Sequence, residues 1–518
     1  IISADDPGAA NSQTEQDTRL YARMAEILGI EPSSPQEAKN MVIKALEISE
    51  KVKLPVFMHV TNRILYGRGS VIMSKPQDIE YNAEFKNEDL RWYLAGRNVV
   101  KRHRWLHDQQ KQLKNIAEDF QFNDIEWAEQ KQYGIITSGV SYYYTKEAVK
   151  DSPIKDKISI LKLSCFNPLP ENYIKQFLGK IDEILVVEEL EPFIEERIKG
   201  IASEIDRKVQ IYGKLTHHFS ETDSFYPEMV KEIIAKLWLK EKEAIPEVVF
   251  KREIKTKLAE LTKVFPQRGI TFCPGCPHRA AFYILKRILK KRNEEFVVAG
   301  DVGCYLLGSL PPICLGDAVF CMGASISMAC GLYQAKVKKK IIAIIGDSTF
   351  LHAGIPALIN CCYSNIDAFI YILDNRTVAM TGLQPYPGIG VGVKGEKTKS
   401  VKLENIAKAC GADYVKVVNP FDFNAAGKAL TKALKMRGQR VLIARHGCPA
   451  AIRNMNDQGD KITKKYRIDF KRCTRCKRCI VDLGCPAIFI RENQVQINEF
   501  LCAGCGLCIR ICPNRAIF

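Results

Sequence analysis

The feature that most constrains this chain is a group of eight cysteines close to its carboxyl end. They form two runs with two-residue gaps, and a Cys-Pro pair closes each run. Thiolates at this spacing wrap iron-sulfur cubanes, and the closing cysteine of each run serves the other cluster because the chain has turned away. Zinc needs only paired C-x2-C motifs without a trailing Cys-Pro, so two [4Fe-4S] clusters are the favoured prediction. The first cysteine set is Cys473, Cys476, Cys479 and Cys512, and the second cysteine set is Cys485, Cys502, Cys505 and Cys508.

The first run is less regular than the second. Five residues separate Cys479 from Cys485, whereas three separate Cys508 from Cys512. The loop before Cys485 must therefore bulge if the second cysteine set is to hold a cubane. We predict a small α+β domain with two clusters of the ferredoxin type over 464–518.

A strand-helix-strand pattern in the middle of the chain predicts a metal site made of oxygen ligands. Apolar runs at 341–345 and 369–373 indicate buried parallel strands, and the apolar segment 353–362 indicates the crossover helix. Asp347 and Asn375 then follow the carboxyl ends of the two strands, where open parallel sheets bind ligands. A carboxylate and an amide oxygen suit Mg²⁺, which shares its ligands with phosphates, so we expect a diphosphate carried by Mg²⁺. The alternative is an ordinary turn in which Asp caps a helix.

Composition and charge narrow the class of protein. A length of 518 residues leaves room for three or four domains. The sequence shows no run of 18 apolar residues and no signal peptide. Its nineteen cysteines are an odd number, which argues against a full disulfide framework. We therefore expect a cytoplasmic protein. The net charge of +17 comes from Lys and Arg that are spread along the chain, which argues against nucleic acid as a partner. Four basic residues instead lie among the cluster cysteines and predict docking of an acidic partner: Arg472, Arg475, Lys477 and Arg478.

The motifs resemble those of a known family. Gly346-Asp347-Ser348 followed by Asn375 is similar to the thiamine diphosphate motif, with Ser348 as a departure from the usual Gly. In combination with two clusters, the motif order resembles the 2-oxoacid:ferredoxin oxidoreductases, and within them the thiamine-binding alpha subunits of the indolepyruvate branch. The segments that carry this likeness are 272–279, 300–305, 321–325, 374–376 and 379–382, together with the terminal cysteine-rich domain.

The resemblance implies a function and a set of binding residues. It implies oxidative decarboxylation of aryl 2-oxoacids such as indolepyruvate to the aryl-acetyl-CoA, with ferredoxin as electron acceptor and a small beta subunit as partner. It implies that Mg²⁺ is held by Asp347, Asn375 and the carbonyl oxygen of Thr377. The catalytic glutamate of the family is expected before Ile1, so no catalytic residue is assigned. The implied cofactor-binding residues are His278, Gly303, Cys304, Gly323, Ser325, Gly346, Asp347, Ser348, Asn375 and Thr377.

The resemblance also implies a fold class and a domain order. We expect several doubly wound parallel-sheet domains of the thiamine diphosphate-binding type and a small two-cluster ferredoxin domain. The beginning of the sequence is similar to the end of a strand, which suggests that it starts inside a domain. The expected segments are the carboxyl-terminal part of a pyrimidine-binding domain at 1–74, a linker at 75–125, a transketolase C-terminal-like domain at 126–216, a helical connector at 217–268, the thiamine diphosphate and Mg²⁺ domain at 269–455 and the cluster domain at 464–518.

Four further cysteines leave one question open. Cys273 and Cys276 form a C-x2-C pair, Cys304 follows a strand end, and Cys448 follows the last strand of the core domain. Related oxidoreductases hold a third cubane beside thiamine with such a pair and two distant cysteines. The alternative is that the turn at 273–278 only lines the cofactor. We call these four residues the third cysteine set.

Two other classes of function remain alternatives. One is a non-oxidative thiamine-dependent decarboxylase that carries a ferredoxin domain, and the other is a pure electron-transfer protein. Reduction of ferredoxin that depends on coenzyme A would exclude both. Another 2-oxoacid is also an open alternative, because the sequence does not fix the side chain that the substrate carries.

Overall fold

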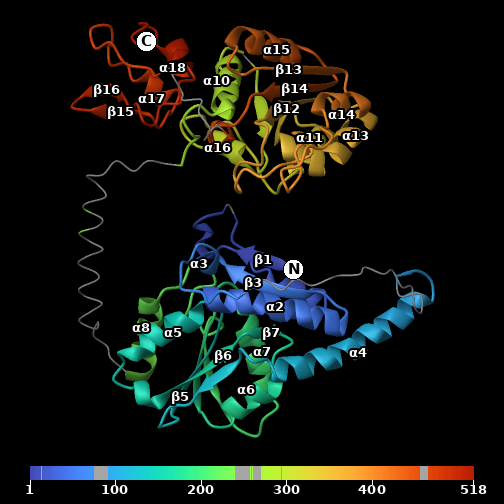
Figure 1. The fold of residues 1–518 in the computed structure, drawn as a ribbon, viewed down its shortest axis with the longest axis vertical. Helices are drawn as coiled ribbons and strands as arrows, with labels where there is room; N and C mark the ends of the chain where they lie inside the picture. The colour runs from blue at the N-terminus through green and yellow to red at the C-terminus, as the bar shows by residue number, and fades with distance from the viewer. Residues whose placement is uncertain are drawn as a thin grey trace. The chain divides into compact units, whose positions relative to one another are not determined.

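The computed structural model describes residues 1–12, 14–74, 92–239, 257, 260, 270–292, 294–455 and 465–518. The chain divides into two compact units, 1–264 and 265–518, and each is described by itself (Figure 1). The beginning of the expected linker, 75–91, and most of the expected helical connector, 240–268 apart from 257 and 260, lie outside the described residues. Among the described helices, none combines the length and the apolar character that a membrane span requires.

The first unit contains two sheets. One has the strand order β1-β3-β2-β7, in which only β7 runs antiparallel to its neighbour, and the other has the order β4-β6-β5-β8-β9, in which only β4 does. The strands are β1 (Ile2–Asp5), β2 (Leu28–Ile30), β3 (Val56–Thr61), β4 (Asp124–Glu126), β5 (Tyr133–Ser138), β6 (Ile158–Leu163), β7 (Cys165–Asn167), β8 (Glu183–Val187) and β9 (Gln210–Tyr212).

Helices cover both sheets of the first unit. The longest is α4, which begins on the surface and buries Leu113 and Ala117 in the core of the first sheet. Helix α2 begins at a proline, where the Ser34 hydroxyl accepts a hydrogen bond from the Glu37 N–H and caps the helix. The helices are α1 (Arg19–Met24), α2 (Pro35–Val52), α3 (Asn62–Leu65), α4 (Asn98–Glu118), α5 (Ser141–Lys150), α6 (Glu171–Leu178), α7 (Phe193–Ala202) and α8 (Pro227–Ile234), with the short 3₁₀ helices η1 (Pro7–Ala9) and η3 (Lys155–Lys157) and the π-helix η4 (Ala235–Leu239).

The second unit is organised around a five-stranded parallel sheet with the order β10-β11-β12-β14-β13. Because strand side chains alternate between faces, β11 and β12 supply two different cores. Ile342, Ile344 and Tyr371 pack under one helix layer, whereas Ile345 and Ile372 pack under the other. The strands are β10 (Phe296–Ala299), β11 (Lys340–Gly346), β12 (Ala368–Asp374), β13 (Tyr414–Val418) and β14 (Gln439–Arg445).

Helices on both faces make this sheet doubly wound (Figure 1). Helices α10 and α15 cover one face and α11, α13 and α14 cover the other. The expected class, α/β with parallel sheets, is therefore confirmed, and the runs predicted as strands at 341–345 and 369–373 lie in β11 and β12. The helices are α10 (Pro277–Leu289), α11 (Ala324–Gln334), α12 (Asp347–Thr349), α13 (Ile355–Tyr363), α14 (Leu403–Ala409), α15 (Phe423–Lys435) and α16 (Pro449–Met455), with the 3₁₀ helix η5 (Cys304–Ser309) and the π-helix η6 (Phe350–Gly354).

The cysteine-rich end of the chain packs on helix α10. It has one antiparallel hairpin and two short helices, and its core residues Leu483 and Leu507 share a cluster with Ala280 and Tyr283 of α10. This contact joins the cysteines to the parallel-sheet domain within one compact unit. The elements are α17 (Arg478–Val481), β15 (Ile488–Arg491), β16 (Gln494–Ile497) and α18 (Leu507–Ile511).

Candidate functional site

Asp347 and Asn375 meet at the carboxyl edge of the parallel sheet. Asp347 directly follows β11 and Asn375 directly follows β12, and both side chains are buried. The backbone N–H of Arg376 donates to Asp347 Oδ2 at 2.9 Å, which ties the two loops together. The N–H of Thr377 donates to Asn375 Oδ1 at 3.4 Å. The structure therefore brings the three residues expected to hold Mg²⁺ into one place.

The charge around Asp347 suits a cation. Burial and the neighbouring carboxyl of Asp374 raise the pKa of Asp347 to about 8. Asp374 is itself paired with Arg445, whose Nε lies 2.5 Å from Asp374 Oδ2. Within the described residues Asp347 has no such partner. A buried carboxylate without a counter-charge is costly, and a divalent cation bound to it would remove that cost.

The turn before α11 has the form of a cradle for phosphate. Gly323 has φ +95°, and a Cβ on it would lie 2.4 Å from the Cβ of Ala353, so only glycine fits. The carboxylate of Asp301 accepts hydrogen bonds from the N–H groups of Gly323 and Ser325, at 2.9 and 3.3 Å. The hydroxyl oxygen of Ser325 is buried and lies beside the Asp301 carboxylate. A buried hydroxyl beside a helix start fits a diphosphate group.

His278 and Gly346 both pack against Tyr305 in the parallel-sheet domain. Burial lowers the pKa of His278 to about 4, so its imidazole is neutral. Its ring lies edge-on to Tyr305 at 6.0 Å between centroids. A Cβ on Gly346 would lie 2.4 Å from a ring carbon of Tyr305, so glycine allows the tyrosine to pack here. Gly303 directly precedes η5, and Ser348 lies in α12.

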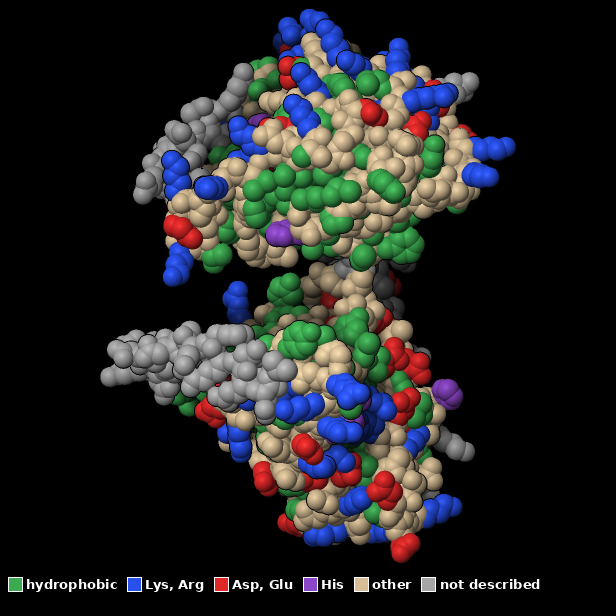
Figure 2. All heavy atoms as spheres, turned by 90° about the vertical axis from the view of Figure 1, so that its right-hand side faces the viewer, with side chains coloured by type: hydrophobic (Ala, Val, Ile, Leu, Met, Phe, Trp, Pro, Cys, Tyr) green, Lys and Arg blue, Asp and Glu red, His purple; other side chains and the backbone are tan. Residues whose placement is uncertain are grey.

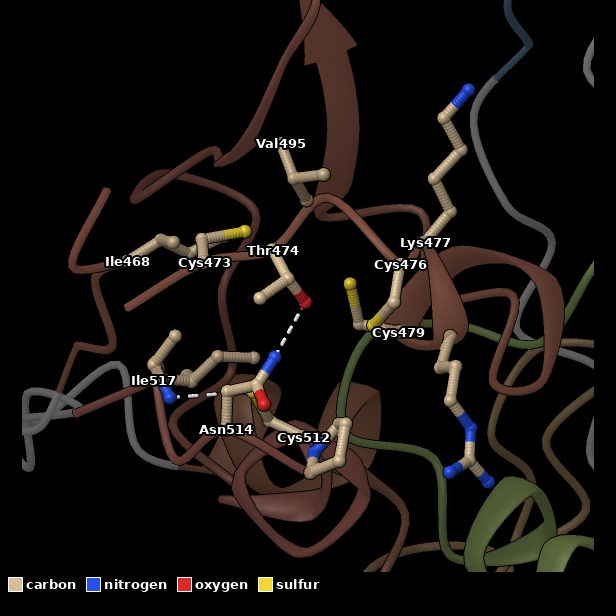
Figure 3. Close-up of a pocket in the computed structure, with 13 residues that line it drawn as sticks. Ile468, Cys473, Thr474, Cys476, Lys477, Cys479, Val495, Cys512, Asn514 and Ile517 are labelled. Atoms are coloured by element: carbon tan, nitrogen blue, oxygen red, sulfur yellow. Dashed lines mark hydrogen bonds between the residues drawn. The ribbon is translucent and has the colours of Figure 1, made fainter. Parts of the chain in front are cut away.

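The sulfurs of the cysteine-rich domain fall into two groups. The first cysteine set lines one pocket, into which its labelled side chains converge in Figure 3. The second cysteine set lines another pocket, together with Arg279 and Gly275 of the parallel-sheet domain. Burial raises the pKa of Cys479 to about 11 and that of Cys508 to about 12, and in each case the neighbouring thiols come from the residue's own set. Four convergent thiols in each pocket fit the donor set of a cubane.

The third cysteine set is also gathered. Burial raises the pKa of Cys304 to about 11, and the charges of Cys448, Cys273 and Asp347 add to this effect. The Cys276 N–H donates to the Cys273 carbonyl at 3.2 Å, closing a tight turn. The Cys448 N–H donates to the Asn375 carbonyl at 2.9 Å. Cys304 and Cys448 therefore lie beside the expected Mg²⁺ site, and Cys273 lies near Cys304.

The four basic residues among the cluster cysteines are exposed. Arg478 pairs with Asp482 at 3.0 Å and Arg472 with Asp469 at 3.4 Å. On the face seen in Figure 2, Lys and Arg are scattered over both units rather than gathered in one continuous stripe. Because exposed ion pairs contribute little to stability, these arginines can exchange them for contacts with a partner.

Sequence reasoning did not single out several residues of the site. Asp374 is the last residue of β12 and Asp301 follows β10, and this position at the strand ends was the available signal. Arg445 closes β14 and lies far from Asp374 in sequence, so only the fold brings the pair together. Tyr386 lies 3.4 Å from Asp374 through its hydroxyl, on a loop without a recognisable motif.

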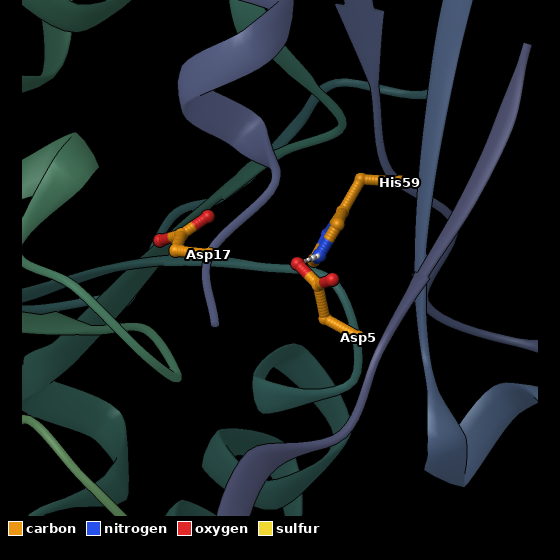
Figure 4. A group of neighbouring side chains, drawn as sticks. All are labelled: Asp5, Asp17 and His59. Atoms are coloured by element: carbon orange, nitrogen blue, oxygen red, sulfur yellow. Dashed lines mark hydrogen bonds and ion pairs between the residues drawn. The ribbon is translucent and has the colours of Figure 1, made fainter. Parts of the chain in front are cut away.

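A buried group of ionic side chains lies in the first unit (Figure 4). His59 Nδ1 lies 2.8 Å from Glu31 and His59 Nε2 lies 3.0 Å from Asp5. Although burial opposes its charge, the two carboxylates raise the pKa of His59 to about 9, so the imidazole is protonated near neutral pH. Asp5, Asp17 and His59 offer ligand atoms within 4.8 Å of one another, yet Asp17 pairs with Arg19 at 2.5 Å. We therefore interpret the group as an ionic network and not as a metal site.

Comparison with known proteins identifies two domain types in this chain. Residues 301–444 match the thiamine pyrophosphate enzyme C-terminal TPP binding domain, and residues 465–513 match a 4Fe-4S dicluster domain. The fold and these matches define a thiamine diphosphate-binding protein with a two-cluster iron-sulfur domain. The chain is 35% identical over 522 residues to the indolepyruvate oxidoreductase subunit IorA of Archaeoglobus fulgidus. This match covers 100% of this chain and 80% of that protein. Identity to the IorA subunit of Thermococcus kodakarensis is 36% over 538 residues, with 100% and 81% covered.

The chain belongs to the family of the indolepyruvate oxidoreductase subunits IorA, as the motifs led us to expect. A more distant relative is the 2-oxoglutarate oxidoreductase subunit KorB of Mycobacterium tuberculosis, which is 26% identical over 262 residues, 46% of this chain and 69% of that protein. The chain spans about 80% of the length of the IorA proteins that it matches.

Proposed function

We propose that this chain is the thiamine diphosphate-binding subunit of an enzyme that oxidises aryl 2-oxoacids such as indolepyruvate to aryl-acetyl-CoA and passes the electrons to ferredoxin. The family membership and the names of its relatives support this substrate class. The observation that carries the proposal is the presence, in one compact unit, of an oxygen-ligand site at Asp347 and Asn375 and of two pockets lined by four thiols each.

Asp347, Asn375 and the carbonyl of Thr377 would hold Mg²⁺, and Ser325 with the Gly323 turn would hold the diphosphate. The buried hydroxyl of Ser325 and the buried carboxyl of Asp347, which has no counter-charge among the described residues, support this assignment. When bound, thiamine diphosphate allows a 2-oxoacid to lose CO2 and leaves two electrons that clusters can accept one at a time. The protein contributes the binding of the cofactor and two buried side chains, a neutral His278 and Tyr305.

The first and second cysteine sets would hold one [4Fe-4S] cluster each, which the match to a dicluster domain supports. A third cluster in the third cysteine set is supported by the nearness of Cys304 to Cys448 and Cys273. Such a cluster would lie beside the Mg²⁺ site and would shorten the path of the electrons. Iron analysis separates two clusters from three.

The expected domain order and partners complete the proposal. A small beta subunit and ferredoxin are the proposed protein partners, and the exposed basic residues Arg475 and Arg478 form part of the proposed docking surface for ferredoxin. Residues 269–455 are the proposed cofactor domain, and 464–518 the proposed electron-transfer domain.

The test is a substrate panel with the anaerobically purified chain and its small subunit. We expect indolepyruvate and phenylpyruvate to drive ferredoxin reduction faster than pyruvate, and only when coenzyme A is present. Release of aldehyde without electron transfer would show the non-oxidative decarboxylase. If dithionite reduces the clusters but no 2-oxoacid does, the result would favour the alternative of a pure electron-transfer protein.

A further inference from the structure

Arg279 is a buried cation at the junction between the parallel-sheet domain and the cysteine-rich domain. It is the third residue of α10, and only 1% of its surface is exposed. Its Nη1 donates to the carbonyl oxygens of Leu483 at 2.7 Å and Gly484 at 2.5 Å, and its Nη2 donates to the carbonyl of Phe272. Its Nε is buried and has no hydrogen-bond partner in the described part of the chain.

Within the described residues, no carboxylate balances this guanidinium, because its hydrogen bonds go to backbone carbonyl oxygens. Burial lowers the pKa of Arg279, and the neighbours whose negative charge opposes that effect are all cysteines: Cys485, Cys276, Cys505 and Cys273. A buried cation that lacks an anion is costly, so these thiol groups are its natural counter-charge once they are thiolates that bind iron.

Close backbone packing holds the guanidinium in place. A Cβ on Gly275 would lie 2.6 Å from the Cβ of Ala503, and a Cβ on Gly484 would lie 2.6 Å from Cδ of Pro312. The two domains therefore meet at distances that only glycine allows on these sides. Arg279 also lines the pocket of the second cysteine set and not that of the first. The position of the charge relative to one cluster site is thus fixed by the fold.

We propose that Arg279 sets the reduction potential of the cluster held by the second cysteine set. The inference rests on the proposed iron-sulfur cofactors. A cubane gains one negative charge when it takes up an electron, and net charge and hydrogen bonds at the sulfurs are what tune its potential. A fixed positive charge stabilises the reduced form, and burial protects this effect from screening by salt. The cluster of the second cysteine set, which lies near Cys273 and Cys276, thereby becomes the better of the two acceptors for electrons that leave the thiamine site.

The experiment is a redox titration of the full chain, followed by electron paramagnetic resonance. Arg279→Gln removes the charge, and Arg279→Lys keeps a charge that a buried lysine loses at high pH. Arg478→Gln is the matched control, because this arginine lies near Cys476 of the first cysteine set but is exposed to solvent. Cys505→Ser marks the signal of the second set, since a serine ligand changes that cluster alone.

We expect Arg279→Gln to lower the equilibrium constant for reduction of the marked cluster at least tenfold, which is about 59 mV for a one-electron couple. Arg279→Lys should match the wild type at pH 6.5 and fall toward the glutamine variant at pH 9, whereas the wild type shows no such dependence because arginine stays protonated. Arg478→Gln should leave both potentials unchanged.

Unchanged potentials in an Arg279→Gln protein with full iron content would overturn the inference and leave the proposed function standing. If the glutamine variant loses iron, the lysine variant decides, and a potential that does not depend on pH would equally overturn it. A shift of the same size in Arg478→Gln would show that burial has no special effect. A wild-type chain without iron-sulfur signals would instead refute the proposed cofactors themselves.

Discussion

Replacement of His59 by Gln tests whether the ionic network of the first unit stabilises the fold through a protonated imidazole. The folded pKa of about 9 lies above the ordinary value of 6.5, because Glu31 and Asp5 outweigh the effect of burial. Folding therefore binds a proton. The stabilisation is fully present below pH 6.5 and is lost as the pH rises through 9.

The magnitude follows from the two pKa values. Between pH 7 and pH 9 the proton linkage of His59 removes about 2 kcal/mol from the free energy of unfolding. Glu188 and Glu189, whose pKa values burial raises to about 7, also lose stability as the pH rises, but they do so in wild type and variant alike. The difference between the two proteins therefore isolates the histidine. At pH 7 the variant should be destabilised by about 3–5 kcal/mol, because two buried carboxylates lose their cation.

Scanning calorimetry of the full chain at both pH values is the assay. The stability gap between wild type and His59→Gln should shrink by about 2 kcal/mol from pH 7 to pH 9, which is roughly 4–8 °C in the melting temperature of a unit of this size. His107→Gln is the control, since His107 is exposed on α4 and should have no effect. A gap of equal size at the two pH values would refute the reasoning that the imidazole is charged.

Three further predictions concern the second unit. Asp347→Ala should weaken Mg²⁺-dependent binding of thiamine diphosphate by more than about 100-fold, measured by calorimetry, with unchanged iron content, and wild-type affinity would refute the metal assignment. The double variant Arg475→Glu, Arg478→Glu should reduce ferredoxin severalfold more slowly and with a weaker dependence on salt, but should reduce an artificial dye at the wild-type rate. An equal loss of rate with both acceptors would indicate damage to the cluster. Iron analysis should give roughly twelve atoms per chain for three cubanes and eight for two, and eight atoms that persist in Cys273→Ser would end the case for a third cluster.

Local pattern was sufficient for the parallel sheet and for the residues at its edge. Asp347 and Asn375 stand directly after apolar runs, and strand ends of parallel neighbours must meet at one edge. The grouping of the cysteines also follows from spacing, because short gaps allow three thiols to face one centre. Sequence reasoning therefore reached those side chains whose position depends only on their own strand or turn.

Contacts between distant segments could not be predicted in this way. Arg19 Nη1 lies 2.8 Å from Glu188, 169 residues away in the chain, and nothing near either residue indicates the pairing. Strand β7 joins the first sheet from within the segment expected to form the second domain. The same limit hid Arg279, whose partners at Leu483 and Gly484 lie more than 200 residues further on. In each case long-range packing, and not local propensity, places the charge.

The most direct test of the central claim is the reduction of the chain's own clusters by substrate. The anaerobic protein is supplied with its small subunit, thiamine diphosphate, Mg²⁺ and coenzyme A, indolepyruvate is added, and the electron paramagnetic resonance signal is compared with that produced by dithionite. The account predicts that indolepyruvate generates the same reduced-cluster signal, and that the signal is lost in Asp347→Ala although dithionite still produces it. The contrary result would be wild-type clusters that are reduced by dithionite but by no 2-oxoacid. It would contradict the claim that the oxygen-ligand site and the cysteine sets form one electron path.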